Sequence, residues 1–147
     1  MKRAFDPSLF RWEGVEPRAY KDEPGAARGM AWRGVSRHTL ARGTFEVRYF
    51  ELAPGGFSSL EKHAHMHAVV CVRGRGRALL GSAVADLAPF DLAETAAWVP
   101  HRWMNAGEEP FGFLCTVAGV RDRPVPLEDS EWSALLEDPV TAPFVFG

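Results

Sequence analysis

From Val35 onward, short apolar runs are broken by glycine, proline or aspartate. This punctuation predicts an all-β domain built from short strands. The run Phe45–Leu52 is rich in β-forming residues, and Pro54, Gly55 and Gly56 after it indicate a turn. No pattern repeats with a period of 20 to 50 residues, which argues against a solenoid or propeller. The expected strands are 35–41, 45–53, 57–63, 67–73, 76–81, 83–87, 96–99, 101–105 and 111–119.

The first 34 residues follow neither the helical nor the strand period, and they contain prolines at positions 7, 17 and 24. Their aromatic residues, Trp12, Tyr20 and Trp32 among them, make this segment too apolar for a disordered tail. We therefore expect residues 1–34 to form an extended arm. The arm should pack along the β domain or on a partner subunit, where it covers a sheet edge.

The segment after the last expected strand has a third character. Residues 121–126 read as a loop, and Asp129 or Ser130 can cap a short helix over 131–137. Trp132, Leu135 and Leu136 form one apolar stripe on this helix, and a proline at position 139 ends it. The chain thus divides into an arm (1–34), a β domain (35–120) and a C-terminal loop, helix and tail (121–147).

Composition narrows the classes of function. The chain has 147 residues, which suits one domain, and its formal net charge of −2 argues against a nucleic-acid partner. No apolar run approaches the ~20 residues of a membrane span. The N-terminus MKRAFDPSLF has basic residues without an apolar core, so we expect no signal peptide and a cytoplasmic location. In that compartment Cys71 and Cys115 should be free thiols.

Histidines are concentrated in one stretch. His63, His65 and His67 fall within five residues, Glu61 precedes them, and His101 follows downstream in VPHRWMN. Side chains two positions apart on a strand face the same side. Imidazole and carboxylate groups are ligands for Zn, Fe, Mn, Ni and Co. The stretch therefore predicts a metal site, with a solvated turn as the simpler alternative.

The region from about residue 43 to 119 resembles the cupin superfamily. Its first motif reads Gly, five residues, His-x-His, three or four residues, Glu, six residues, Gly. Counting back from Gly74 puts His67 at the glutamate position, His63 at the second histidine and Glu61 at the first, so the carboxylate and imidazole positions are exchanged. The second motif keeps His101 and Asn105 at the right spacing. It lacks the Pro-x-Gly, because Pro100 directly precedes the histidine.

This resemblance implies a double-stranded β-helix, or jelly-roll barrel, holding one divalent transition metal ion (Fe, Mn, Ni, Co or Zn). The implied ligands are Glu61, His63, His67 and His101, with a turn through 64–66 that leaves His65 at the rim. If the strand instead runs straight, His65 replaces Glu61 in the set. Strand parity from His101 puts Trp103 on the inner face, as a pocket wall or substrate contact, and Cys71 is expected to be a buried core residue.

The resemblance also implies a metal-dependent small-molecule enzyme, an oxidoreductase of dioxygenase type, although it assigns no catalytic residues. Two alternatives remain open. One is a non-catalytic metal or ligand sensor, and the other is an isomerase or cyclase whose histidines act as acid and base. We expect a small-molecule ligand, no nucleic-acid or membrane partner, and a homodimer, because the arm and tail carry many apolar residues.

Overall fold

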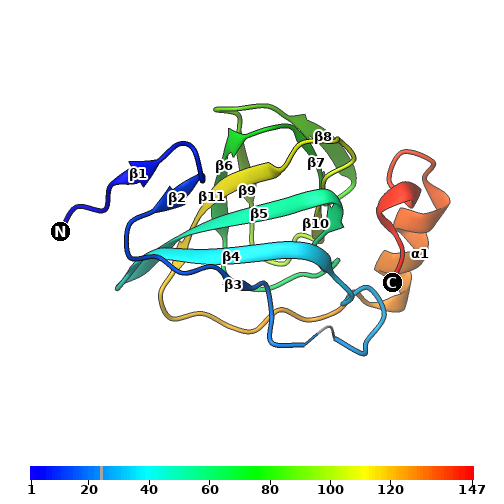
Figure 1. Cartoon of the computed structure of the whole chain (residues 1–147). Coiled ribbons are helices and arrows are strands. Elements are labelled where there is room, and N and C mark those ends of the chain that lie inside the picture. Colours follow the sequence, from blue (N-terminus) through cyan, green and yellow to red (C-terminus); the bar gives the residue numbers. More distant parts are fainter. Residues whose placement is uncertain (24) are drawn as a thin grey trace.

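A curled antiparallel sheet of nine strands forms the body of the computed structural model, which describes residues 1–23 and 25–147 (Figure 1). Pro24, one of the arm prolines noted above, lies outside the described residues. The main strands are β4 (Arg33–Arg42), β5 (Phe45–Phe57), β6 (His67–Arg73), β7 (Gly76–Leu80), β8 (Ala83–Leu87), β9 (Leu92–Thr95), β10 (His101–Met104) and β11 (Phe111–Ala118). Their order is β8-β7-β10-β5-β11-β6-β9, and β4 pairs with β5. The all-β barrel expected from the sequence is confirmed.

Strand β5 joins the two halves of the curled sheet. Its first part, from Phe45 to Leu52, pairs with β11, while Phe57 at its far end pairs with Met104 of β10. Gly56 lies in the stretch between, where an added Cβ would stand 2.7 Å from the carbonyl oxygen of Ala53. This long strand therefore brings β10, which begins at His101, alongside strands that are distant in sequence.

The barrel encloses an apolar core on its inner face. The residues that form it alternate along β5, β6 and β11 and include Phe50, Val69 and Phe113, and Trp103 joins them from β10; all are buried. Alternation of this kind is what a sheet with one face turned to a core requires. The same inner face carries the polar side chains of the candidate site.

The N-terminal arm lies against the barrel. It forms a hairpin of β1 (Phe5–Asp6) and β2 (Arg11–Trp12), followed by β3 (Arg18–Ala19), which pairs with β4. The rings of Phe10 and Trp12 lie 5.4 and 5.1 Å from the ring of Tyr49 on β5. The hairpin thus packs on the outer face of its own barrel, while Tyr20 further along the arm packs against the inner core.

The C-terminal segment forms helix α1 (Asp129–Glu137) and a 3-10 turn, η1 (Ala142–Phe144), on the opposite side of the barrel (Figure 1). The helix begins two residues before the expected start. Its buried Leu135 packs in a second apolar cluster with Leu60, Leu79 and Phe144. Within residues 1–23 and 25–147, no helix has both the length and the apolar character needed to cross a bilayer.

Arg102 ties both chain ends to β10. Its side chain is fully buried and donates hydrogen bonds to the carbonyl oxygens of Gly29, Ser58, Phe144 and Phe146, at 2.7–2.9 Å. Burial lowers the pKa of this guanidinium to about 10. The four acceptors are backbone oxygens from the arm, the barrel and the tail. The single guanidinium thus holds these three segments together.

Two expected strands are absent from the described residues. The 57–63 segment leaves the ladder after Phe57, and only single bridges follow, Glu61 to His101 and Lys62 to Val125. The 96–99 segment is a turn in which Trp98 has a φ of 62°, and the strand lies earlier, at β9. Both segments form connections that support the candidate site.

Candidate metal centre

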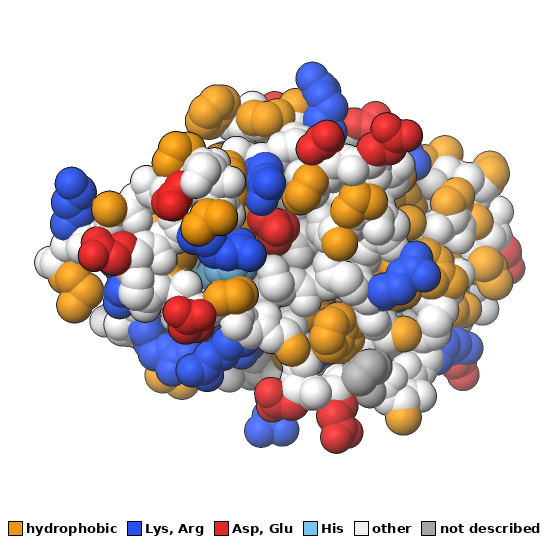
Figure 2. Space-filling view, viewed as in Figure 1, with side chains coloured by type: hydrophobic (Ala, Val, Ile, Leu, Met, Phe, Trp, Pro, Cys, Tyr) orange, Lys and Arg blue, Asp and Glu red, His pale blue; other side chains and the backbone are white. Residues whose placement is uncertain are grey.

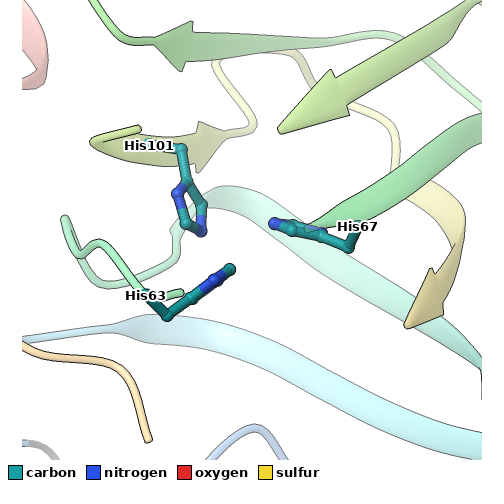
Figure 3. A group of neighbouring side chains, drawn as sticks. All are labelled: His63, His67 and His101. Atoms are coloured by element: carbon teal, nitrogen blue, oxygen red, sulfur yellow. The ribbon is translucent and has the colours of Figure 1, made fainter. Parts of the chain in front are cut away.

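Three imidazoles converge on the inner face of the barrel. His67 opens β6, His101 opens β10, and His63 lies just before a bend at Ala64 and His65. One ligand nitrogen of each lies within 4.8 Å of the others, and all three residues are buried. Figure 3 shows the three rings pointing toward one common space. The chain therefore turns between His63 and His67, as the cupin motif implied, and does not continue as a straight strand.

Backbone carbonyl groups orient two of these rings. The Nδ1 of His63 lies 2.6 Å from the carbonyl oxygen of His65, and the Nδ1 of His101 lies 2.9 Å from that of Val99. A carbonyl only accepts, so each Nδ1 carries the proton and each Nε2 presents a lone pair. A metal-binding histidine is typically held in this way by its second nitrogen.

His67 supplies the clearest indication that the cluster suits a cation. Its Nε2 is buried and has no hydrogen-bond partner among the described residues. Buried polar atoms are nearly always bonded, so an orphaned nitrogen facing two other imidazoles calls for a partner with an empty orbital or a proton. A divalent transition metal fits this donor set. The three-histidine cluster thus indicates a metal-binding site.

The electrostatics keep these rings in the form that binds metal. Burial, and then the charge of His101, lowers the pKa of His67 to about 2. The same two causes lower the pKa of His63 to about 4, and burial lowers that of His101. At neutral pH all three are uncharged imidazoles, which is the ligand form.

Glu61, an expected ligand, is not part of the three-residue group. Its buried carboxylate accepts hydrogen bonds from Lys21 and Ser59, and from the hydroxyl of Tyr20 at 3.4 Å. Burial opposes its ionisation, but the charges of Lys21 and His101 together with these hydrogen bonds lower its pKa overall. Glu61 is therefore an anion that lines the same pocket and is paired with a lysine of the N-terminal arm.

His65 and Trp103, the other two expected site residues, surround the cluster. The ring of His65 stacks on that of His63 at 3.7 Å, and its Nδ1 lies 2.6 Å from Asp122. It does not belong to the group of converging nitrogens. Trp103 is buried in the pocket wall, with its ring 6.3 Å from that of His67.

The cluster opens into a pocket of about 830 Å³ that also contains several basic residues. Figure 2 shows Lys and Arg side chains gathered on one part of the surface, with histidine surface visible between them. Three further residues that line this pocket are not among the site residues expected from the sequence: Arg37, Arg48 and Cys115. Their signal is strand parity, which depends on strand ends that sequence places only to within a few residues.

Cys115 lies next to the cluster. Its sulfur is 3.4 Å from the Nδ1 of His67 and 3.4 Å from a terminal nitrogen of Arg48. Burial raises the pKa of the Cys115 thiol, while the charge and hydrogen bond of Arg48 act in the opposite direction. Cys71, by contrast, belongs to the apolar core as expected, and both cysteines are free thiols.

Comparison with known proteins agrees with this architecture. The family model described as "Cupin domain" matches residues 48–117. A cupin-2 domain protein of known structure from Rhodospirillum rubrum is 37% identical, with a TM-score of 0.82 over 98% of this chain and 95% of that one. A cupin 2 conserved barrel domain protein from Rhodopseudomonas palustris is 34% identical, with a TM-score of 0.86 over the whole of both chains.

One relative has a named activity. The 1-methylthio-D-xylulose 5-phosphate methylsulfurylase of Rhodospirillum rubrum is 41% identical over 150 residues, which cover 99% of this chain and 94% of the relative. The similarity thus includes the N-terminal arm and the C-terminal tail as well as the barrel.

Proposed function

The chain belongs to the cupin family, and from this premise we propose that it is a metal-dependent enzyme that removes the methylthio group from a methylthio ketose phosphate. The observation that carries this proposal is the 41% identity, over nearly the whole of both chains, with a methylsulfurylase of that substrate. The three-histidine cluster and the neighbouring thiol supply groups suited to the chemistry.

The substrate class explains why a metal site is useful. In a 1-methylthio ketose, the carbon that bears sulfur is next to the ketone carbon. When sulfur leaves toward an attacking thiol, the electron pair of the carbon–sulfur bond must pass to that ketone. A divalent ion held by His63, His67 and His101 would supply Lewis-acid polarisation of the ketone oxygen.

We assign the attacking thiol to Cys115. When the Nε2 of His67 is directed at a metal, its Nδ1 retains the proton and donates toward the Cys115 sulfur, 3.4 Å away. Arg48 donates to the same sulfur at 3.4 Å. Burial raises the pKa of this thiol overall, but Arg48 acts in the opposite direction, and the two donors would stabilise the thiolate, which is the nucleophile.

The proposed step is balanced as follows. The Cys115 thiolate attacks the methylthio sulfur, so a sulfur–sulfur bond forms and the bond from sulfur to carbon 1 breaks. The electron pair passes to the sugar as an enolate, which takes a proton at carbon 1 and becomes a 1-deoxy ketose phosphate. The sugar carbon is reduced and the cysteine is oxidised to a methyl disulfide. A low-molecular-weight thiol then reduces this disulfide by exchange and carries the methylthio group away.

The oxygenase type expected from the sequence remains a prediction. The named relative favours carbon–sulfur chemistry over oxygen chemistry, and an enzyme over a sensor. An isomerase acting on the same class of sugar would use the same polarised ketone, but it would leave Cys115 without a role. The contact between Cys115 and His67 is the observation that favours thiol chemistry.

The test uses the metal-loaded protein with 1-methylthio-D-xylulose 5-phosphate. With dithiothreitol present, the expected product is the 1-deoxy ketose phosphate, with no oxygen uptake at an electrode. Without added thiol, one turnover should add a single methylthio group to Cys115, seen by mass spectrometry of the peptide. Cys115→Ser should bind metal as well as the parent but form no product, whereas Cys71→Ser, the matched control, should remain active.

Two results would overturn the proposal. One is full turnover by Cys115→Ser, and the other is oxygen consumption coupled to product formation. Full turnover by Cys115→Ser would remove the nucleophilic role of Cys115, and coupled oxygen consumption would return the assignment to the oxygenase alternative.

A further inference from the structure

The pocket contains a row of functional side chains that crosses four strands. His67 on β6 pairs with Val117 on β11, two residues from Cys115, and Cys115 itself pairs with Arg48 on β5. On β4, Arg37 pairs with Phe50, two residues from Arg48. All of these except Val117 line the pocket. The row therefore runs from the three-histidine cluster through Cys115 to the two arginines.

Three of the six lysine and arginine residues that line the pocket are already neutralised. Lys21 pairs with Glu61, while Arg42 and Arg121 share Glu46 at 3.2 and 3.0 Å. Each of these cations therefore has a carboxylate partner within the protein.

The other three are Arg123, Arg37 and Arg48; Arg123 is exposed, whereas Arg37 and Arg48 are half-buried. Neither forms an ion pair within residues 1–23 and 25–147, and the Nε of each is buried without a hydrogen-bond partner there. Burial, and then the charge of Arg48, lowers the pKa of Arg37, although the charges of Asp22 and Glu46 act in the opposite direction. Unsatisfied guanidinium donors directed into a pocket are suited to a bound anion.

Resting on the proposed function, we propose that Arg37 and Arg48 bind the phosphate group of the sugar-phosphate substrate. Planar guanidinium groups bind phosphate oxygens through two hydrogen bonds at once. Arg37 is two strands from Cys115 and two residues out of register with it, so their backbones lie roughly 12 Å apart. That separation suits an extended five-carbon sugar whose methylthio end lies at the thiol and whose phosphate is held mainly by Arg37, with Arg48, which contacts the Cys115 sulfur at 3.4 Å, lying between the two ends. The two arginines thereby select phosphorylated over free sugars.

The experiment measures binding by calorimetry on the metal-loaded protein, with D-xylulose 5-phosphate, D-xylulose and inorganic phosphate as probes. The phosphate ester should bind, and free xylulose should bind at least about tenfold more weakly, because charged hydrogen bonds are lost. Arg37→Gln should weaken the ester by about tenfold or more and leave xylulose unchanged. Arg48→Lys keeps the charge but not the planar guanidinium, and it should give an intermediate loss of affinity for the ester. It takes the place of Arg48→Gln if that variant proves unstable.

The matched control is Arg75→Gln, which removes an exposed arginine from the hairpin turn outside the pocket and should bind the ester normally. Equal binding of D-xylulose 5-phosphate by the parent and Arg37→Gln would overturn the phosphate site, as would equal binding of ester and free sugar. The outcome is separable from the proposed reaction. If the ester binds through Arg37 but the methylthio substrate is not turned over, the phosphate site stands and the reaction fails.

Discussion

His65 contacts the three-histidine cluster through its ring and through its backbone carbonyl, and a substitution separates the two contacts. Its ring stacks on that of His63, and its backbone carbonyl accepts a hydrogen bond from the Nδ1 of His63 at 2.6 Å. His65→Ala removes only the ring, so we expect its metal content, measured by elemental analysis, to stay near that of the parent. His63→Ala should lose most of the metal. An empty site in His65→Ala with a filled site in His63→Ala would contradict the ligand assignment.

Glu61 should act on the metal site from outside it. Because its carboxylate is held by Lys21 and Ser59, Glu61→Gln should lower metal affinity by at most about 10- to 100-fold, the range for outer-shell partners. His101→Ala should abolish binding, since it removes one of three converging nitrogens. Calorimetric titration with Zn²⁺ or Mn²⁺ compares the two. An equal loss in both would place the carboxylate on the metal.

Burial of neutral imidazoles makes the metal-free protein sensitive to acid. The folded state holds the pKa of His67 at about 2 and of His63 at about 4, against about 6.5 in an unfolded chain. Between these values the unfolded state binds more protons, so the free energy of unfolding should fall as pH drops from 7 to 4. One such histidine contributes up to about 1.4 kcal/mol per pH unit. Urea unfolding at several pH values measures this slope, which should be smaller in His67→Asn.

The cupin resemblance predicted that His63, His67 and His101 come together, whereas spacing alone also allowed a straight strand that adds His65 to the set. The resemblance and the spacing were not enough for Glu61, whose partner is Lys21, forty residues earlier in an arm with no regular period. Arg48 was left unassigned because its strand parity was ambiguous. The pairing of Arg48 with the buried Cys115 on β11 settles that parity, and it is not readable from local sequence.

At the scale of elements, β10 depends on the charge that it buries. Arg102→Lys keeps a positive charge but cannot reach four carbonyl oxygens in three segments, so several buried acceptors lose their donor. We expect the free energy of unfolding to fall by about 3 kcal/mol or more, because each charged hydrogen bond contributes about 1.5–3 kcal/mol. Urea denaturation measures the change. The exposed Arg75→Lys should change stability little, and an equally small effect at Arg102 would refute this role.

Strands buried on one face were the easiest elements to predict. β6 and the helix were found within two residues, because their apolar residues keep a clear period. β9 is not predicted because it is a short strand at the end of the sheet order, and its two apolar residues are followed by two polar ones without alternation. The apolar segment around Trp98 suggested a strand instead. Its N–H donates to the carbonyl oxygen of His63, so it is a loop that holds the site.

At the scale of the whole molecule, the predicted homodimer remains to be tested. The hairpin of the arm covers the outer face of its own barrel, yet the surface still exposes large apolar side chains, with Phe90 84% and Leu92 68% exposed beside the end strand β9. Exposed apolar groups next to an open strand edge favour pairing with a second copy. Light scattering should give about twice 16.3 kDa. Leu92→Glu should yield monomer, Val140→Glu should not, and a monomeric parent at all concentrations would exclude the dimer.

The position of Arg102 also has a consequence for the order of events during biosynthesis. Its acceptors at Gly29 and Ser58 are translated before it, whereas those at Phe144 and Phe146 follow every barrel strand. A nascent chain that has already paired its strands therefore lacks two of the acceptors of Arg102 until Phe144 and Phe146 have left the ribosome. Docking of this segment on β10 should accordingly be a late step of folding, after the barrel strands have paired.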